Sequence, residues 1–395
     1  MNILFLIISI LTFILAFSCL LIEIYIFKKA PFLEVNFSKE PINTSLHVII
    51  PTYNEEINII KCLKALNKIS RPSIQLKISV VDDSSNDKTV LKVENFKNEV
   101  FKNPEELEII SSGPRPMEKK WVGKNWPCYV GSKGINSEWI LFIDADVVVG
   151  ENCIRKALTK ASKENIDLLS LAPKVNCNCL AEWMVQPIMT SLLMIGFPIF
   201  DTNNKNSDTA FAAGPFMLFK SNSYNFIKGH EGTHDEVVED LALAKKIKDS
   251  NLKLNFLIAI KDISLNMYED LNTLIEGWSK NWFLGLEKNL LKSISASLFV
   301  FFTYSMPWLL FGISIIISVT KQTTSFLPVG FISFLAIFAY ILKRYWLKAQ
   351  YNISEKYWFL SGVGGIIVVY ISFLSIYKTY TGKNWTWKGR NLSDA

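Results

Sequence analysis

The stretch WILFIDAD, residues 139–146, decides the fold. It opens with five consecutive apolar residues and ends in two carboxylates, Asp144 and Asp146, separated by one residue. A short apolar run of this kind is typical of a strand buried on both faces of a parallel sheet. The two carboxylates would then lie beyond the carboxyl end of the strand, where open α/β sheets bind ligands. Hard oxygen ligands at that position favour a divalent metal, Mg²⁺ or Mn²⁺.

Further strands are expected on the amino-terminal side of this stretch. Apolar or β-rich runs occupy residues 47–50, 77–81 and 108–111, and residues 58–67 have the spacing of an amphipathic helix. This alternation predicts an α/β fold with an open, mostly parallel sheet. Polar clusters follow three of the expected strands, at residues 52–56, 82–87 and 144–146. The sequence therefore predicts a ligand site at the carboxyl edge of the sheet.

The chain as a whole is too apolar for a typical soluble protein. Half of its 395 residues are hydrophobic, and its mean hydropathy is +0.23. Segments 1–27, 296–319, 326–342 and 358–377 are candidates to cross a lipid bilayer, although the third is short for a span. Lys28 and Lys29 follow the first segment and favour a cytoplasmic location for the domain after it. The net charge of +6 is not gathered in a basic, aromatic-studded stripe, so no nucleic-acid partner is expected.

These patterns divide the chain into four parts. We expect a membrane anchor over residues 1–29, a catalytic domain over 42–290, transmembrane or interfacial helices over 291–380 and a basic, cytoplasmic-type tail over 381–395. The predicted location is the cell membrane, with several crossings and a cytoplasmic catalytic domain.

Two adjacent acidic pairs accompany the Asp144/Asp146 pair. Asp82 and Asp83 follow the second expected strand, and Glu239 and Asp240 precede a helix-like pattern. Both pairs are also compatible with helix capping, because carboxylates stabilise helix amino termini. The functional alternatives are recognition of a nucleoside by the first pair and a general base in the second.

The order of these motifs resembles the inverting family 2 glycosyltransferases of GT-A fold. The carrying segments are PTYNEE (51–56), VDDSS (81–85), Asp144-x-Asp146 and Glu239-Asp240, with Ser84 where that family usually has glycine. Segments KWVGKNW (120–126), AGPFML (213–218), EGWSKN (276–281) and WKGR (387–390) are similar to membrane glycosyltransferases of apolar lipids. These include the diaponeurosporenoate (carotenoid) glucosyltransferases and the hopanoid-associated glycosyltransferases.

The resemblance implies a GT-A domain flanked by transmembrane helices, a UDP-sugar-type donor, an apolar lipid acceptor and a divalent metal. It also implies roles for individual residues. Asp240 is the expected base, with Glu239 as the alternative, Asp146 binds the metal, and Asp144 binds the ribose or the metal. The expected donor contacts are Asp83 with Asp82 on the uracil, Pro51, Tyr53 and Glu55 around the nucleoside, Lys124 near the base or the diphosphate, and Lys280 near the diphosphate. Lys280 is equally compatible with a lysine snorkelling at the membrane interface.

One family motif is broken. Many relatives carry Q-x-x-R-W, whereas residues 278–282 read WSKNW. This departure counts against a processive polysaccharide synthase, which remains one alternative. A non-enzymatic scaffold on a degenerate transferase fold is the other.

Overall fold

A computed structural model describes residues 3–34, 43–383 and 385–391 of the chain. The chain forms two compact units. A helical unit comprises Met1–Lys29, Cys177–Gly196 and Tyr268–Lys383, and an α/β unit comprises Ala30–Asn176, Phe197–Met267 and Asn384–Ala395. The expected domain 42–290 thus contains two segments that group with the apolar helices. Of the expected tail 381–395, Asn384 and residues 392–395 lie outside the described residues.

The helical unit is built from the most apolar segments of the chain. Its elements are α1 (Ile3–Lys29), α6 (Leu180–Gly196), α10 (Leu271–Gly285), α11 (Leu290–Val300), the π-helical turn η3 (Phe301–Ser305), α12 (Met306–Thr320), α13 (Leu327–Tyr351), the 3-10 turn η4 (Trp358–Leu360) and α14 (Ser361–Thr381). Within the described residues, four helical segments are long and apolar enough to cross a membrane: Ile3–Lys29, Leu290–Thr320, Leu327–Tyr351 and Trp358–Thr381. They coincide with the four segments expected from hydropathy.

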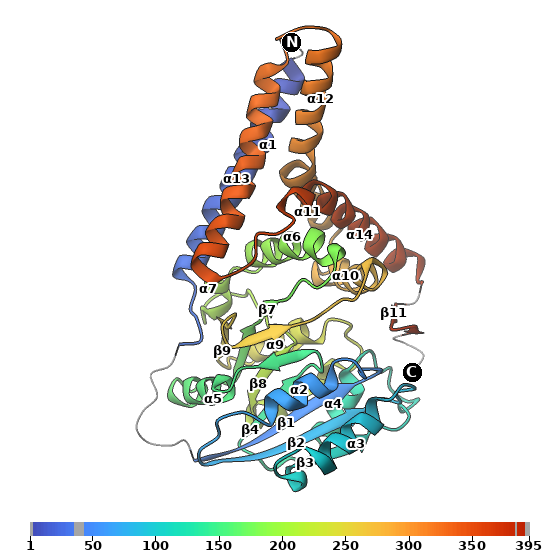
Figure 1. The fold of residues 1–395 in the computed structure, drawn as a ribbon. Helices are drawn as coiled ribbons and strands as arrows, with labels where there is room; N and C mark the ends of the chain where they lie inside the picture. Colours follow the sequence, from blue (N-terminus) through green and yellow to red (C-terminus); the bar gives the residue numbers. More distant parts are fainter. Residues whose placement is uncertain (1–2, 35–42, 384, 392–395) are drawn as a thin grey trace. The chain divides into compact units, whose positions relative to one another are not determined.

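Helix α13 is longer than its apolar stretch. The expected segment stopped at residue 342, before Lys343 and Arg344, yet the helix continues to Tyr351. It continues because both cations are buried and paired within the helical unit: Lys343 with Glu23 of α1, and Arg344 with the carbonyl oxygen of Ser354. Helices α1 and α13 lie side by side (Figure 1). Their polar residues therefore face each other, and the charges do not end the helix.

Close packing in the helical unit depends on glycine. A Cβ at Gly364 of α14 would lie 2.0 Å from the carbonyl oxygen of Met184 on α6. A Cβ at Gly365 would lie 2.3 Å from Ser305 Oγ. No other residue type lets helix backbones approach so closely. The glycine cluster in this helix is thus a packing surface.

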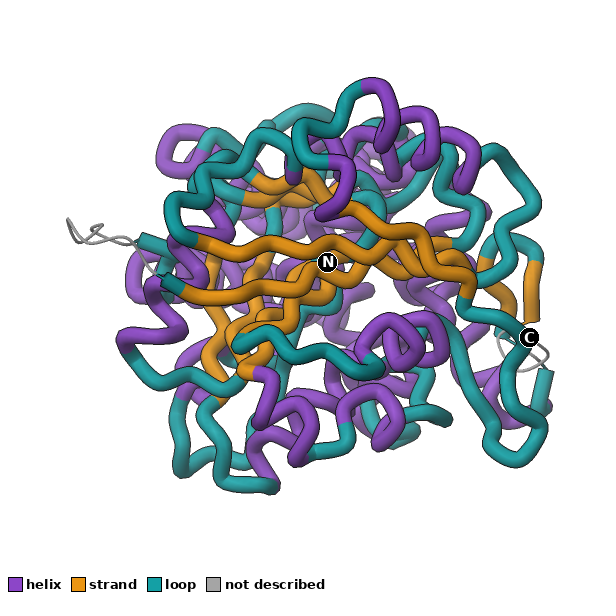
Figure 2. The backbone as a smooth tube through the Cα atoms, turned by 90° about the horizontal axis from the view of Figure 1, so that it is seen from below, coloured by secondary structure: helices purple, strands orange, loops and turns teal. Residues whose placement is uncertain are grey.

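The α/β unit contains a seven-stranded sheet in the order β3-β2-β1-β4-β8-β6-β9. Its strands are β1 (Thr44–Thr52), β2 (Ile74–Asp82), β3 (Leu107–Ser111), β4 (Trp139–Ile143), β6 (Leu168–Ala172), β8 (Phe216–Lys220) and β9 (Leu254–Ile258). Only β8 runs antiparallel to its neighbours. Figure 2 shows the strands as one twisted layer. The expectation of an open, mostly parallel sheet is confirmed.

Smaller elements complete this unit. Strands β5 (Val147–Val149), β10 (Ile263–Leu265) and β7 (Lys174–Val175) form a three-stranded sheet, and β11 (Thr386–Trp387) pairs with β12 (Arg390–Asn391). The helices are α2 (Ile59–Leu66), α3 (Thr89–Glu99), η1 (Pro104–Glu106), α4 (Asn125–Ser132), α5 (Cys153–Lys163), α7 (Ile199–Asn203), α8 (Ser221–Phe226), η2 (Gly229–Thr233) and α9 (Glu239–Asp249).

The seven-stranded sheet is buried on both faces because its strands are apolar at successive positions. Val48 and Ile50 of β1 belong to one core cluster, which includes Leu63 of α2. Ile49 between them belongs to a second cluster, with Leu243 of α9 on its side of the sheet. Successive side chains of a strand point to opposite faces. This arrangement explains why the central strands read as continuous apolar runs.

Candidate active site

Acidic residues just after β4 and in the first turn of α9 meet around one lysine. Lys124, immediately before α4, places its Nζ 2.6 Å from Asp144 Oδ1 and 3.0 Å from Glu239 Oε1. Asp144 immediately follows β4, and Glu239 is the first residue of α9. Residues distant in sequence are thereby joined in one half-buried cluster. The structure brings together the metal-type and base-type acidic pairs that the sequence singled out.

The charge of Lys124 is stabilised by its neighbours. Burial alone lowers the pKa of an ammonium group, but the carboxylates of Asp144 and Glu239 outweigh burial and raise the pKa of Lys124 well above its ordinary value. The lysine is therefore a fixed cation at neutral pH. It offsets part of the negative charge that four neighbouring carboxylates concentrate at this edge of the sheet.

Asp240 is held rigidly by backbone amides. Its Oδ2 accepts a hydrogen bond of 3.0 Å from Gly214 N–H, and its Oδ1 accepts one of 2.9 Å from Leu241 N–H. A Cβ at residue 214 would lie 3.1 Å from both Asp240 Oδ2 and Lys124 Nζ. A side chain there would crowd both charged groups, so glycine favours the close approach of the AGPFML segment to the carboxylate.

The environment of Asp240 adjusts its acidity. Burial, followed by repulsion from Glu239, raises the pKa of Asp240 from its ordinary value of 3.8 to about 7. A carboxylate with a pKa near the working pH can accept a proton and later release it, which is what a general base requires. Glu239 is already engaged by Lys124, so Asp240 is the better candidate of the two for that role.

Asp146 is suited to bind a cation. Its Oδ1 is buried and has no hydrogen-bond partner among the described residues. Burial, with repulsion from Asp144 and Glu55, raises the pKa of Asp146 well above its ordinary range. A divalent cation would satisfy the orphan oxygen and offset the repulsion.

No group of three or more His, Cys, Asp or Glu side chains poised around a common metal position occurs within the described ranges. Mg²⁺ is commonly held by one or two carboxylates together with the phosphates of a substrate. Asp146 and Asp144 therefore fit the expected metal as a two-carboxylate site.

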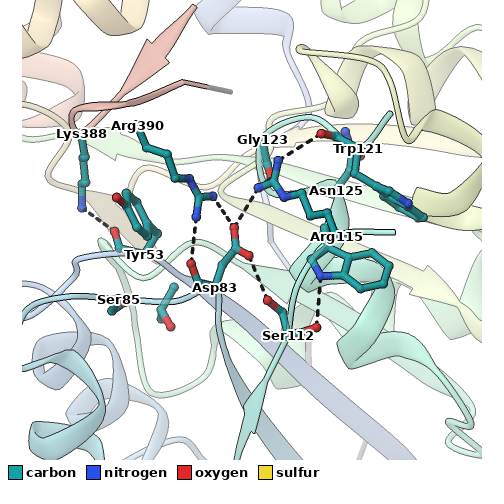
Figure 3. Close-up of polar contacts among 12 residues, drawn as sticks. Tyr53, Asp83, Ser85, Ser112, Arg115, Trp121, Gly123, Asn125, Lys388 and Arg390 are labelled. Carbon is teal, nitrogen blue, oxygen red and sulfur yellow. Dashed lines mark hydrogen bonds and ion pairs between the residues drawn. The ribbon is translucent and has the colours of Figure 1, made fainter. Parts of the chain in front are cut away.

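The second part of the site surrounds Asp83, one residue beyond β2. Its carboxylate accepts hydrogen bonds of 2.9 Å from Ser112 and from Arg115, and a further one from Arg390 of β12 (Figure 3). Arg115 is held in turn by the carbonyl oxygens of Trp121 and Gly123. The carboxylate expected to meet the nucleobase is thus anchored in a network of donors.

The remaining residues of the expected nucleoside pocket lie at the end of β1. Pro51 pairs with Val81 of β2 but lies beyond the pairing with β4, so its missing N–H costs no hydrogen bond on that side. The guanidinium carbon of Arg390 lies over the Tyr53 ring, 4.1 Å from the ring centroid. Glu55 pairs with Lys388 at 2.7 Å. All three half-buried residues are within the α/β unit.

Asp82 has a more local role than its neighbour. Its Oδ2 accepts a hydrogen bond from the backbone N–H of Ser85, and Thr52 Oγ1 lies 3.5 Å from its Oδ1. Neither carboxylate caps a helix, because α3 begins only at Thr89. Asp82 stabilises the turn that follows β2, while Asp83 faces the cluster of arginines. Sequence position alone could not separate them.

Several expected or missed residues complete the comparison with the sequence. Lys280 belongs to α10 of the helical unit, whereas the other candidates belong to the α/β unit. His230 is buried against Tyr224 and has the structural role that a lone histidine usually has. The sequence analysis missed Arg115. Its position in the loop after β3, at the carboxyl edge of the sheet, is the signal that could have identified it. Lys388 and Arg390 were noted only as part of a motif.

Comparison with known proteins finds similarity to glycosyltransferases. Residues 47–227 match the model of Glycosyl transferase family 2. The chain is 27% identical over 244 residues to the 4,4'-diaponeurosporenoate glycosyltransferase of Staphylococcus haemolyticus, which covers 61% of this chain and 62% of the relative. It is 24% identical over 240 residues to the protein of the same name from Staphylococcus aureus MRSA252, covering 60% of each. The chain thus spans about three fifths of the curated relatives it matches.

Among solved structures, the mannosyltransferase PcManGT of Pyrobaculum calidifontis, in complex with GDP-Man and Mn²⁺, superimposes with a TM-score of 0.53 at 13% identity. The match covers 96% of this chain and 99% of that one. Such a likeness at 13% identity reports the fold alone. The expected GT-A fold is therefore confirmed, and residues 47–227 match the Glycosyl transferase family 2 model.

Proposed function

We propose that this chain is a membrane-bound inverting glycosyltransferase that moves a sugar from a nucleoside diphosphate sugar to an apolar lipid acceptor. The observation that carries the proposal is Asp240, a carboxylate with a pKa raised to about 7, fixed by two backbone amides beside the Lys124 cluster. A base so placed is useful in a single displacement, where the acceptor must lose a proton as it attacks.

The proposed step forms one bond and breaks another. The acceptor oxygen bonds to the anomeric carbon, the bond from that carbon to the diphosphate breaks, and Asp240 takes the hydroxyl proton. Lys124 contributes fixed positive charge near the departing diphosphate. A divalent cation on Asp146 and Asp144 would neutralise charge on the leaving group when bound. The acceptor group is a hydroxyl or a carboxylate, and Asp240 acts as a base with a hydroxyl, because an ionised carboxylate has no proton to lose.

An apolar acceptor is proposed on two grounds. Four helices of the described chain are long and apolar enough to cross a membrane. The two curated relatives described above are named for diaponeurosporenoate, a carotenoid acid. We further propose that the helical unit holds the chain in the cell membrane in several crossings, with the catalytic domain on the cytoplasmic side, as Lys28 and Lys29 suggest.

The test uses the full chain in lipid nanodiscs prepared with bacterial lipid extract. Radiolabelled UDP- and GDP-sugars are supplied with Mn²⁺, and label is counted in the organic and aqueous phases. We expect label in the organic phase, and its loss by a factor of about 10² to 10⁴ in Asp240→Asn. Asp249→Asn, exposed at the other end of α9, is the matched control. Label in an aqueous polymer, or full activity of Asp240→Asn, would contradict the proposal.

A further inference from the structure

The β11–β12 hairpin lies against the residues proposed to bind the nucleoside. Its turn residues Lys388 and Gly389 both have positive φ, 49° and 78°, as the primed turns of two-residue hairpins require. Lys388 donates 2.7 Å hydrogen bonds to Asn54 O and Glu55 Oε1. A two-stranded hairpin is barely stable alone. Contacts with the ends of β1 and β2 therefore hold it in place.

Arg390 of this hairpin occupies the space between Tyr53 and Asp83 (Figure 3). The guanidinium carbon lies 4.1 Å from the centroid of the Tyr53 ring. Its Nη1 donates a 2.9 Å hydrogen bond to the backbone oxygen of Asp83, and its Nη2 donates to the carboxylate. A flat group that covers an aromatic ring while its edge N–H groups donate to a carboxylate has the contacts of a nucleobase. Bases stack on aromatic side chains in this way, and a uracil imide N–H can donate to a carboxylate.

Arg390 is also the exchangeable partner of Asp83. The Asp83 side chain is only 6% exposed, and Arg115 behind it is 5% exposed and bound to two backbone carbonyls. The Arg390 side chain is 21% exposed and belongs to a short hairpin. While Arg390 is bound to Asp83, the carboxylate is not accessible to another ligand. A base can therefore reach this carboxylate when Arg390 leaves, and Arg115 and Ser112 keep the carboxylate anchored when it does.

We propose that the β11–β12 hairpin is a strap on the donor site, in which Arg390 holds the place of the nucleobase between Tyr53 and Asp83 and is displaced when the donor enters. This inference rests on the proposed function, because it requires a nucleoside at Asp83. The strap keeps a buried carboxylate paired until a base replaces the guanidinium. Donor affinity then depends on the fraction of molecules in which the strap is open.

The first test measures binding of uridine and UDP to the full chain in nanodiscs by calorimetry, with guanosine and GDP as the second pair. If the strap is closed in about nine molecules of ten, Arg390→Ala should tighten nucleoside and nucleotide binding equally, by up to roughly tenfold. Lys388→Ala, which removes the other attachment, should act in the same direction. Arg71→Ala is the matched control, because it breaks an arginine–carboxylate pair with Glu106 near the opposite end of β2.

The outcomes separate the inference from the proposed function. Weaker UDP binding with unchanged uridine binding would make Arg390 a diphosphate ligand and overturn the strap. Weaker binding of both, or no change in either, would overturn it as well. In each of these cases the wild type still binds a nucleotide, so the proposed function stands. Absence of nucleotide binding to wild type and variants alike overturns both.

The second test needs no variant. Hydrogen exchange of peptides covering Thr386–Trp387 and Arg390–Asn391 is followed in the wild type with and without saturating UDP. Displacement of the strap predicts faster exchange in these peptides on binding, with β3 as an internal reference. Slower exchange would mean that the hairpin closes over the nucleotide, which contradicts displacement.

Discussion

Lys343 of α13 and Glu23 of α1 form an ion pair of 2.9 Å between Nζ and Oε1, with both side chains at most 4% exposed. Ser191 Oγ lies 3.2 Å from the same ammonium group. Ionisable residues inside apolar helices are costly and are tolerated when they pair with each other. The pair thus joins the first helix of the chain to one more than three hundred residues later.

Breaking this pair should destabilise the helical unit. Glu23→Gln leaves the Lys343 charge buried without its partner, and we expect a loss of about 3 to 5 kcal/mol in unfolding free energy. Thermal unfolding in detergent measures it. The double variant Glu23→Gln/Lys343→Met should recover most of the loss, since no charge remains. Glu355→Gln breaks the solvent-screened pair with Lys348 and should destabilise the protein far less than Glu23→Gln does. Equal losses of stability in Glu23→Gln and Glu355→Gln would contradict a stabilising role for the buried Glu23–Lys343 pair.

Lys124 should control the acidity of Asp240. The ammonium group lowers the pKa of that carboxyl against burial and repulsion from Glu239, which raise it. Lys124→Met should therefore shift the acidic limb of the pH–rate profile to higher pH and weaken binding of the nucleoside diphosphate. Lys133→Met, at the other end of α4, is the control because that lysine is exposed. If the acidic limb does not shift in Lys124→Met, Lys124 does not affect the pKa of Asp240.

Asp146 should govern metal affinity. Because its pKa is raised by burial and by Asp144 and Glu55, Mn²⁺ must displace a proton, and Mn²⁺ binding should strengthen as pH rises. Asp146→Asn should weaken Mn²⁺ binding by at least about tenfold, by analogy with the loss of a metal-site partner. Electron paramagnetic resonance of free Mn²⁺ measures this without any turnover. Asp262→Asn, which removes the carboxylate paired with Lys156, should leave the affinity unchanged. Equal Mn²⁺ affinity in wild type and Asp146→Asn would exclude this residue as a ligand.

Local patterns predicted much of the fold, and contacts distant in sequence lay beyond them. The run 139–143 became β4 with the same bounds, because five apolar residues before a polar turn suit a strand buried on both faces. The antiparallel insertion of β8 between β4 and β6 was not foreseen, since periodicity reports how a strand is buried and not which strand it pairs with.

The candidate site divides in the same way. Acidic pairs at strand ends could be identified because each lies within one short segment. The hydrogen-bonded contact between Arg390 and Asp83 joins residues 307 positions apart in the sequence. Neither hydropathy nor motif spacing carries information about such a pairing, so the tail motif was noticed without a role.

The rate of transfer should depend on the ionisation of Asp240. A base must be deprotonated to act, and burial with Glu239 repulsion raises the pKa of this carboxyl to about 7. The turnover number should therefore fall about tenfold per pH unit below pH 7 and level off above it. A limb near pH 4, the ordinary value for Asp, would contradict the assignment.

Stability should change with pH in the opposite direction. Between about pH 4 and pH 7 the folded chain holds a proton on Asp240 that the unfolded chain has released, so unfolding free energy falls as pH rises through this window. Asp240→Asn cannot ionise, so its unfolding free energy should fall less than that of the wild type over the same range. Chemical unfolding of both proteins at pH 5 and pH 8 measures the difference. A base kept protonated by its surroundings at the expense of stability is expected at a catalytic position and not at a helix cap, because a cap lowers the pKa of its carboxyl.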